Sequence, residues 1–187
     1  MKLPRHQVIF TDECGDHLLK IAAEKGSIHS VQKLIQLKFN INSISGSAAV
    51  SPLQIACHRG HYDVVNYLLK SGAIVDQKNN LGYTALHYAC QRGSVDCATL
   101  LIKKFANVNA MTAYGCTPLY LACEANQLAC AKLLLENYAN PNAENIFYFT
   151  PITVAFHAGH KECVALLKSH GAKHAIEDEQ HDPQILY

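Results

Sequence analysis

Residues 115–123, Gly-Cys-Thr-Pro-Leu-Tyr-Leu-Ala-Cys, nearly repeat residues 82–90, Gly-Tyr-Thr-Ala-Leu-His-Tyr-Ala-Cys, at a distance of 33 residues. The same step leads forward to Thr-Pro-Ile-Thr-Val-Ala at 150–155 and back to Ser-Pro-Leu-Gln-Ile-Ala-Cys at 51–57. A weaker fifth copy, residues 15–23, lies 34 residues before the second. A unit of this length cannot bury its own apolar face, so the period predicts units that stack on one another.

Each unit carries the signals of two helices. In the second unit, Ser51 can cap a helix that begins at Pro52, because a hydroxyl accepts from an unpaired N–H and proline tolerates the first turn. Gly60 turns the chain into a second apolar helix, which Gly72 ends in a left-handed conformation. The extended residues that follow predict a hairpin before the next cap. We therefore expect an all-α solenoid of five stacked helix-turn-helix units with projecting β-hairpin loops.

The third and fourth units have an aromatic residue in place of the glycine that ends the second helix. Phe105 and Tyr138 occupy that position, where a bulky residue in a left-handed conformation costs about 1 kcal/mol or more. Either the turn differs there, or the rings gain contacts that offset the strain.

The repeats account for most of the 187 residues. We expect an N-terminal segment at 1–12, whose apolar patch, Val8 to Phe10, either covers the open end of the stack or stays loose, and a C-terminal tail at 175–187. Between them lies one repeat domain, 13–174, whose units span 13–46, 47–79, 80–112, 113–145 and 146–174.

The overall charge favours no polyanionic partner. The formal net charge is +1, so no broad electrostatic field indicates binding to nucleic acid or to a membrane. Neither a signal peptide nor a run of 18 apolar residues is present. We expect a soluble monomer of the cytoplasm, or also of the nucleus.

Six of the eight cysteines fall into two columns at the repeat period: Cys57, Cys90 and Cys123, and Cys97, Cys130 and Cys163. Stacked helices are about 8–10 Å apart, so thiols of one column are too far apart to share a metal ion or to form a disulfide. We expect buried free thiols there, and a possible reactive thiol only at Cys116, which falls on a predicted hairpin. The sequence also lacks the motifs of nucleophilic catalysis and phosphate binding, so we expect neither a cofactor nor an enzyme.

The 33-residue period, the Thr-Pro-Leu-x-x-Ala cap and the Gly-His turns resemble ankyrin repeats over about residues 13–174. The resemblance implies a curved solenoid whose concave side binds another protein. Residues 117–134, with Asp96-Cys97 and Glu162-Cys163, resemble more narrowly the repeats of ankyrin-and-SOCS-box proteins, which are substrate-recognition subunits of cullin-type ubiquitin ligases. No SOCS box follows the repeats in this sequence, so either the chain is a repeat-only relative or the box lies outside it.

The ankyrin resemblance implies one modification. Asn42, Asn109 and Asn142 occupy the hairpin position that an oxygen-dependent hydroxylase modifies in some members of the family. The alternative role of these side chains is to bond the turn backbone.

The predicted hairpins carry apolar residues where polar ones are usual, and such patches often mark binding sites. This predicted stripe consists of Leu81, Tyr83, Met111, Tyr114, Ile146, Phe147 and Phe149, with Tyr148 expected to fold back onto its neighbours. Residues before the inter-helix turns would complete the concave face, namely Arg59, Arg92, Glu124 and His157. With both arginines beside the stripe, we predict a partner segment in which apolar anchors flank an acidic residue.

Overall fold

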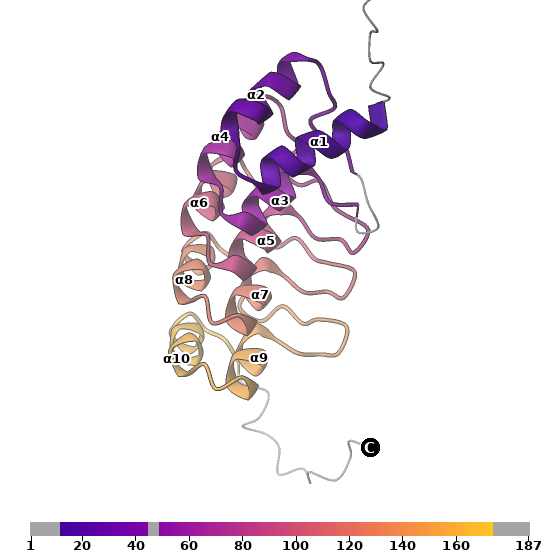
Figure 1. Cartoon of the computed structure of the whole chain (residues 1–187). Helices are drawn as coiled ribbons and strands as arrows, with labels where there is room; N and C mark the ends of the chain where they lie inside the picture. The colour runs from indigo at the N-terminus through magenta and orange to yellow at the C-terminus, as the bar shows by residue number, and fades with distance from the viewer. Residues whose placement is uncertain (1–11, 45–48, 174–187) are drawn as a thin grey trace, which may run out of the picture.

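The computed structural model describes residues 12–44 and 49–173, without the side chains of 12–16. The predictions for the N-terminal apolar patch, for residues 45–48 and for the C-terminal tail lie outside this part. The described residues form ten helices in five pairs (Figure 1). Their bounds are α1 Asp12–Glu24, α2 Ile28–Gln36, α3 Pro52–Arg59, α4 Tyr62–Lys70, α5 Ala85–Arg92, α6 Val95–Lys103, α7 Pro118–Glu124, α8 Leu128–Glu136, α9 Pro151–His157 and α10 Lys161–Ser169.

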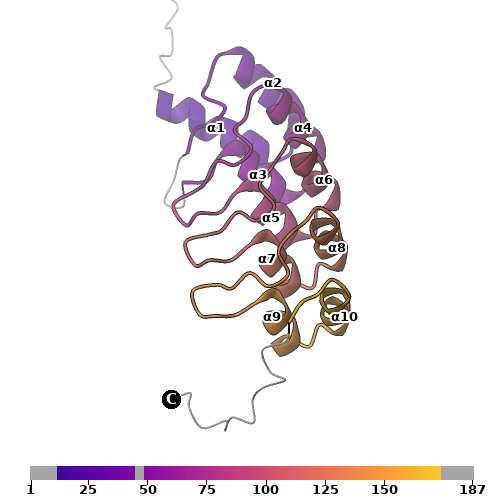
Figure 2. The ribbon, with the colours of Figure 1, turned by 180° about the vertical axis from the view of Figure 1, so that it is seen from behind.

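The five pairs stack into a curved solenoid of two helical layers. Helices α1, α3, α5, α7 and α9 pack on one another in one layer, and the even-numbered helices form the other. Loops shaped like hairpins project from the odd-numbered layer, as Figures 1 and 2 show from opposite sides. The predicted all-α solenoid of five helix pairs is confirmed. The hairpins differ from the prediction in one respect, because no β-strand forms within residues 12–44 and 49–173.

The odd-numbered helices begin as the sequence predicts. The Ser51 hydroxyl accepts from the backbone N–H of Gln54, whose side chain accepts in turn from the N–H of Ser51, and this completes a capping box. Thr117 and Thr150 accept in the same way at the starts of α7 and α9. Each cap satisfies an N–H that the helix itself leaves unpaired.

The turn between the two helices of a unit needs a left-handed residue. Gly93 supplies it after α5, with φ of +78°. This backbone conformation is the reason that glycine suits the position, because a residue with a Cβ is strained there. Asn126 adopts φ of +54° after α7, as expected for the commonest non-glycine residue in this region.

Three aromatic residues occupy left-handed positions with their rings in solvent. Phe105 and Tyr138 have φ of +64°, and Tyr148 has φ of +63°. Their exposed fractions are 92%, 90% and 80%. Both explanations for Phe105 and Tyr138 are therefore wrong, because the turn keeps its glycine-like geometry and the rings gain no contacts that offset the strain. The prediction that Tyr148 folds back is also wrong.

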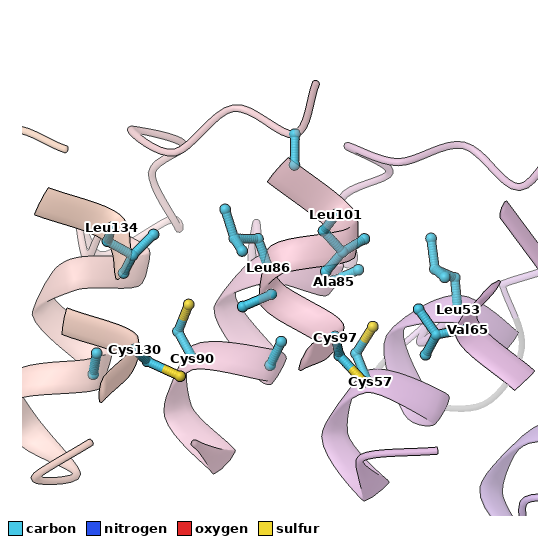
Figure 3. Packing of buried hydrophobic residues seen from close by; sticks show 14 of the residues in the cluster. Leu53, Cys57, Val65, Ala85, Leu86, Cys90, Cys97, Leu101, Cys130 and Leu134 are labelled. Atoms are coloured by element: carbon cyan, nitrogen blue, oxygen red, sulfur yellow. The ribbon is translucent and has the colours of Figure 1, made fainter. Parts of the chain in front are cut away.

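Buried leucines and thiols fill the space between the layers. Leu53, Leu86, Leu119 and Ile152 point inward from successive odd-numbered helices, and Leu68, Leu101, Leu134 and Leu167 meet them from the even-numbered helices. The six column cysteines lie in the same core, each no more than 1% exposed, and Figure 3 shows four of them, Cys57, Cys90, Cys97 and Cys130. Their predicted burial as free thiols is confirmed.

Polar side chains join neighbouring units at regular places. A ring nitrogen of His61 lies 2.9 Å from the carbonyl of Glu24, and one of His160 lies 2.9 Å from that of Cys123. Each of the three predicted asparagines accepts from a backbone N–H of the following unit, Asn109 for example from Asn140 at 2.8 Å. The backbone-bonding role that was the alternative for the three asparagines is confirmed, and the two histidines have the same role.

Candidate protein-binding surface

Three successive hairpins, at residues 77–84, 110–117 and 143–150, share one way of closing. In each, a backbone N–H donates a hydrogen bond to the carbonyl four residues later, at a distance of 3.0 Å. The three bonds run from Asn79 to Tyr83, from Thr112 to Cys116 and from Asn145 to Phe149. The side-chain oxygen of the first residue also accepts from two backbone N–H groups of the loop. Nearly all polar groups at the hairpin base are thus satisfied.

The hairpins are also bonded to one another. Ala113 N–H donates to the Leu81 carbonyl at 2.8 Å, and Ile146 N–H donates to the Tyr114 carbonyl at 3.0 Å. A Cβ at Gly82 would lie 2.8 Å from the backbone nitrogen of Ala113, so the first hairpin approaches the second too closely for any other residue. Tyr148 occupies the equivalent position of the last hairpin, which no further hairpin covers in the described part of the chain.

Polar residues of the odd-numbered helices bond to backbone carbonyls at the bases of the hairpins. Gln54 donates to the carbonyl of Tyr83 at 2.9 Å, and His87 lies with its Nε2 3.1 Å from the carbonyl of Cys116. The Thr84 N–H donates to His87 Nδ1, so the ring is neutral with its proton on Nε2. Burial of this ring lowers the pKa of His87 to about 4.

The hairpin tips expose most of the predicted stripe. Tyr114 is 47% exposed and Phe147 is 62% exposed. The other exposed apolar side chains of the three hairpins are Leu81, Met111, Ile146, Tyr148 and Phe149. They come from adjacent hairpins held in fixed register by backbone hydrogen bonds, so they lie along a single edge of the solenoid.

Tyr83 differs from the rest of the stripe because its ring packs inward. The ring centroid lies 5.4 Å from that of Tyr88 and 5.6 Å from that of His87. Tyr88 in turn accepts a hydrogen bond from the Asn79 side chain at 2.9 Å and meets the His58 ring at 5.5 Å. Burial raises the pKa of both tyrosines. Tyr83 is therefore part of an internal aromatic cluster, and its ring is only half available to a partner.

Sequence reasoning missed Tyr88 as part of this surface. The half-buried Tyr88 lies in α5 between the hairpins and the inter-helix turn. The equivalent residues of the other units are Ile55, Leu121 and Val154, so the replacement of an aliphatic residue by an aromatic one was the available signal. The cluster ends at His58, whose buried Nδ1 has no hydrogen-bond partner and whose pKa is lowered by burial and by the nearby arginines.

The two arginines lie at the opposite end of the odd-numbered helices from the hairpins. Arg59 and Arg92 are the last residues of α3 and α5, which places them about 12 Å along the helix from its cap. Their backbone positions are therefore separated from the hairpin bases by the length of the helix, a greater separation than the prediction of arginines beside the stripe assumed.

The arginines also differ from each other. Arg59 forms an ion pair with Glu24 of the first unit, and its guanidinium lowers the pKa of that carboxyl. Both side chains are well exposed, so the pair adds little stability. Arg92 and Glu124 are exposed and form no ion pair within residues 12–44 and 49–173.

His157 lies close to the last hairpin. Its ring centroid is 6.2 Å from that of Phe149 and 6.0 Å from that of Phe156, both in edge-on arrangements. The structure thus brings Phe149 and His157 together from the two ends of α9. The exposed Phe156, which the sequence analysis did not name, extends this aromatic group along the helix.

Metal ligands do not gather anywhere in the described residues, where no group of three His, Cys, Asp or Glu side chains could hold an ion. None of the helices described is both long and apolar enough to cross a membrane. The surface offers apolar, aromatic and charged side chains on a fixed backbone, which is suited to binding.

A family model described as ankyrin repeats, three copies, matches residues 3–79 and 71–145. The chain belongs to the ankyrin-repeat family. Ankyrin repeats are protein–protein interaction modules, and the stacked helix pairs with projecting hairpins agree with that assignment.

Curated relatives are similar over shorter stretches. The chain is 33% identical over 81 residues to Dauer abnormal formation protein 25 of Caenorhabditis elegans, which is 43% of this chain and 21% of that protein. It is 46% identical over 55 residues to human Ankyrin repeat domain-containing protein 40 and 44% identical over 55 residues to the mouse protein, in both cases 29% of this chain and 15% of the relative. These likenesses support ankyrin repeats in general rather than ankyrin-and-SOCS-box proteins in particular.

Proposed function

We propose that this ankyrin domain is a non-catalytic module that binds a partner protein through its hairpin tips and the adjoining concave face. The observation that carries the proposal is the row of exposed apolar side chains on three adjacent hairpins, from Leu81 to Phe149. Soluble proteins seldom leave such a row in water unless it serves as a binding site.

The backbone of the surface is ordered before binding. Hydrogen bonds close each hairpin at its base and join it to the next, so the side chains at the tips start from fixed positions. Binding then costs the conformational entropy of the partner but little conformational entropy of this chain. This lower entropy cost favours affinity. Tyr114 and Phe147 are the strongest candidate anchors, because aromatic residues dominate binding energy at interfaces.

The adjoining concave face contributes charged side chains to the proposed binding surface. Arg92 is exposed beyond the aromatic cluster of Tyr83, Tyr88 and His58, while Arg59 is held by Glu24. We propose a partner segment whose apolar side chains rest on the hairpins and whose acidic residue reaches Arg92. Glu124 and His157 border the same face in the next two units.

Two variants that each remove two exposed aromatic rings test the location. The first replaces Leu81, Tyr114 and Phe147 by Ala at the hairpin tips. The second replaces Phe105 and Tyr138 by Gly, which removes two exposed rings that follow α6 and α8 of the even-numbered layer and restores the glycine found at 72 and 171. Affinity capture from cell lysate followed by quantitative mass spectrometry compares both with the original chain.

A protein that the original chain and the Phe105/Tyr138 variant capture, and that the hairpin variant loses, is the expected result. If the hairpin variant captures the same proteins in the same amounts, the assigned surface is wrong. A loss that appears only with the Phe105/Tyr138 variant moves the binding surface to the ends of α6 and α8.

The same experiment tests the narrower alternative that the chain is a substrate-recognition subunit of a cullin-type ubiquitin ligase. That alternative predicts that elongin and cullin subunits are captured together with the partner. Their absence, when a partner is captured, favours a plain binding module.

A further inference from the structure

The two columns of buried cysteines meet between neighbouring units. Figure 3 shows Cys57 beside Cys97, and Cys90 beside Cys130, where the first helix of one unit packs near the second helix of the next. Cys123 and Cys163 are the equivalent residues one repeat further along the chain, and both are fully buried. The sequence analysis compared thiols only within a column and so missed contacts between columns.

The three cysteine pairs share the same spacing in sequence and the same burial. In each, the partners are 40 residues apart and are no more than 1% exposed. They occupy the three interfaces between the second and fifth units, which are the interfaces spanned by the three exposed hairpins. At the interface between the first two units, the equivalent residues are Ala23 and Val64, both buried, so a plain apolar pair satisfies the same packing.

We propose that these three pairs form a ladder of oxidisable dithiols, each of which closes to a disulfide and links two neighbouring units covalently. The bonds assigned are Cys57–Cys97, Cys90–Cys130 and Cys123–Cys163. The oxidant is a low-molecular-weight disulfide such as oxidised glutathione. The proposal does not depend on the proposed function.

The reaction is two successive exchanges. The thiolate of one cysteine attacks a sulfur of the oxidant, which forms a mixed disulfide and releases one small thiol. The second cysteine then attacks the protein sulfur of the mixed disulfide, and a second small thiol leaves. Two protein thiols are oxidised to one disulfide, and the oxidant takes up the two electrons and two protons as two thiols.

The surroundings of the last pair favour the first exchange there. The Cys123 thiol and the nearby His160 ring lower the pKa of the Cys163 thiol, so its thiolate forms more readily. Because the thiolate is the attacking species, we expect this pair to oxidise first once the two units part and the oxidant reaches it.

The test uses the full chain with Cys14 and Cys116 replaced by Ser, so that only the six paired thiols remain. The folded protein is incubated in buffers of increasing oxidised-to-reduced glutathione ratio, quenched with acid and analysed by intact mass and peptide mapping. The expected result is the loss of two hydrogens per bond, three bonds with the assigned partners, reversal by dithiothreitol, and a thermal midpoint raised by about 4 °C or more.

A matched variant controls for folding. Cys90→Ala with Cys130→Val copies the Ala23 and Val64 pair of the first interface. This variant is expected to keep the circular dichroism of the original chain, to form the other two bonds, and to gain less thermal stability on oxidation. Bonds within one column, or thiols that stay reduced in the folded chain at the most oxidising ratio, would overturn the proposal.

Discussion

The base and the tip of each hairpin differ although only a few residues separate them. At the base of the last hairpin, Asn145 is 7% exposed and its side chain accepts two backbone N–H groups. At the tip, Phe147 is 62% exposed and contributes only its backbone to that network. Different residues therefore stabilise the hairpin and form its exposed surface. Mutations at the tip should change binding, and mutations at the base should change the free energy of unfolding.

The largest effect on stability is expected from protonation of His87, whose ring contacts the backbone carbonyl of Cys116 at a hairpin base. Its pKa is about 4 in the folded chain and 6.5 when unperturbed, so only the unfolded chain gains a proton as the pH falls between these values. The neutral ring therefore contributes about 3 kcal/mol that is fully present above pH 6.5 and is lost as the pH falls to about 4.

The control for this prediction is His87→Gln, which copies Gln54 of the previous unit and its hydrogen bonds to the hairpin backbone. Urea unfolding at a series of pH values compares the two chains. The original chain is expected to lose about 3 kcal/mol more than the variant between pH 6.5 and 4. Parallel curves would show that His87 does not carry the pH dependence.

A second base residue, Asn79, should give a smaller effect. Asn79→Ala leaves the N–H groups of Leu81 and Tyr83 without their acceptor and the Tyr88 hydroxyl without a donor, at a cost of about 2 kcal/mol in the free energy of unfolding. Asn79→Asp keeps the acceptor oxygen and is expected to cost less. Equal losses for the two variants in urea unfolding would mean that the acceptor is not what stabilises the base.

Tyr148 lies at a tip but in a strained backbone conformation. Tyr148→Gly should raise the free energy of unfolding by about 1 kcal/mol, because φ of +63° suits glycine and the ring is mostly in solvent. Phe147→Gly is the control, since that residue has no positive φ and gains nothing from glycine. If both changes destabilise the chain alike, strain at Tyr148 is not the reason.

The smallest effect on stability per residue is expected for the triple replacement of Leu81, Tyr114 and Phe147 by Ala. Their exposed side chains should change the free energy of unfolding by no more than about 0.5 kcal/mol each. Binding of the captured partner should weaken by about tenfold or more. A variant that unfolds readily would show that the tips belong to the stability network after all.

The fold could be predicted because its signals repeat. Caps such as Ser51 and Thr117, turn residues such as Gly93 and Asn126, and inward residues such as Leu86 recur at one period, and each has a local physical reason. The helix pairs and their stacking followed directly.

The site could be predicted only in part, because side-chain direction depends on neighbouring units. The sequence named the apolar tips but could not show that Tyr83 turns toward Tyr88, or that Arg59 pairs with Glu24. The thiol pairs were missed for the same reason, since Cys90 and Cys130 are far apart in sequence and meet only when two units stack.

The most direct test of the central claim places a photo-cross-linking phenylalanine analogue at Phe147, on the last hairpin, or at Phe105, an exposed residue that follows α6. After irradiation in cell lysate, cross-linked proteins are identified by mass spectrometry. The account predicts that one partner is cross-linked from position 147 and not from position 105. Cross-linking of that partner from position 105 alone would contradict it.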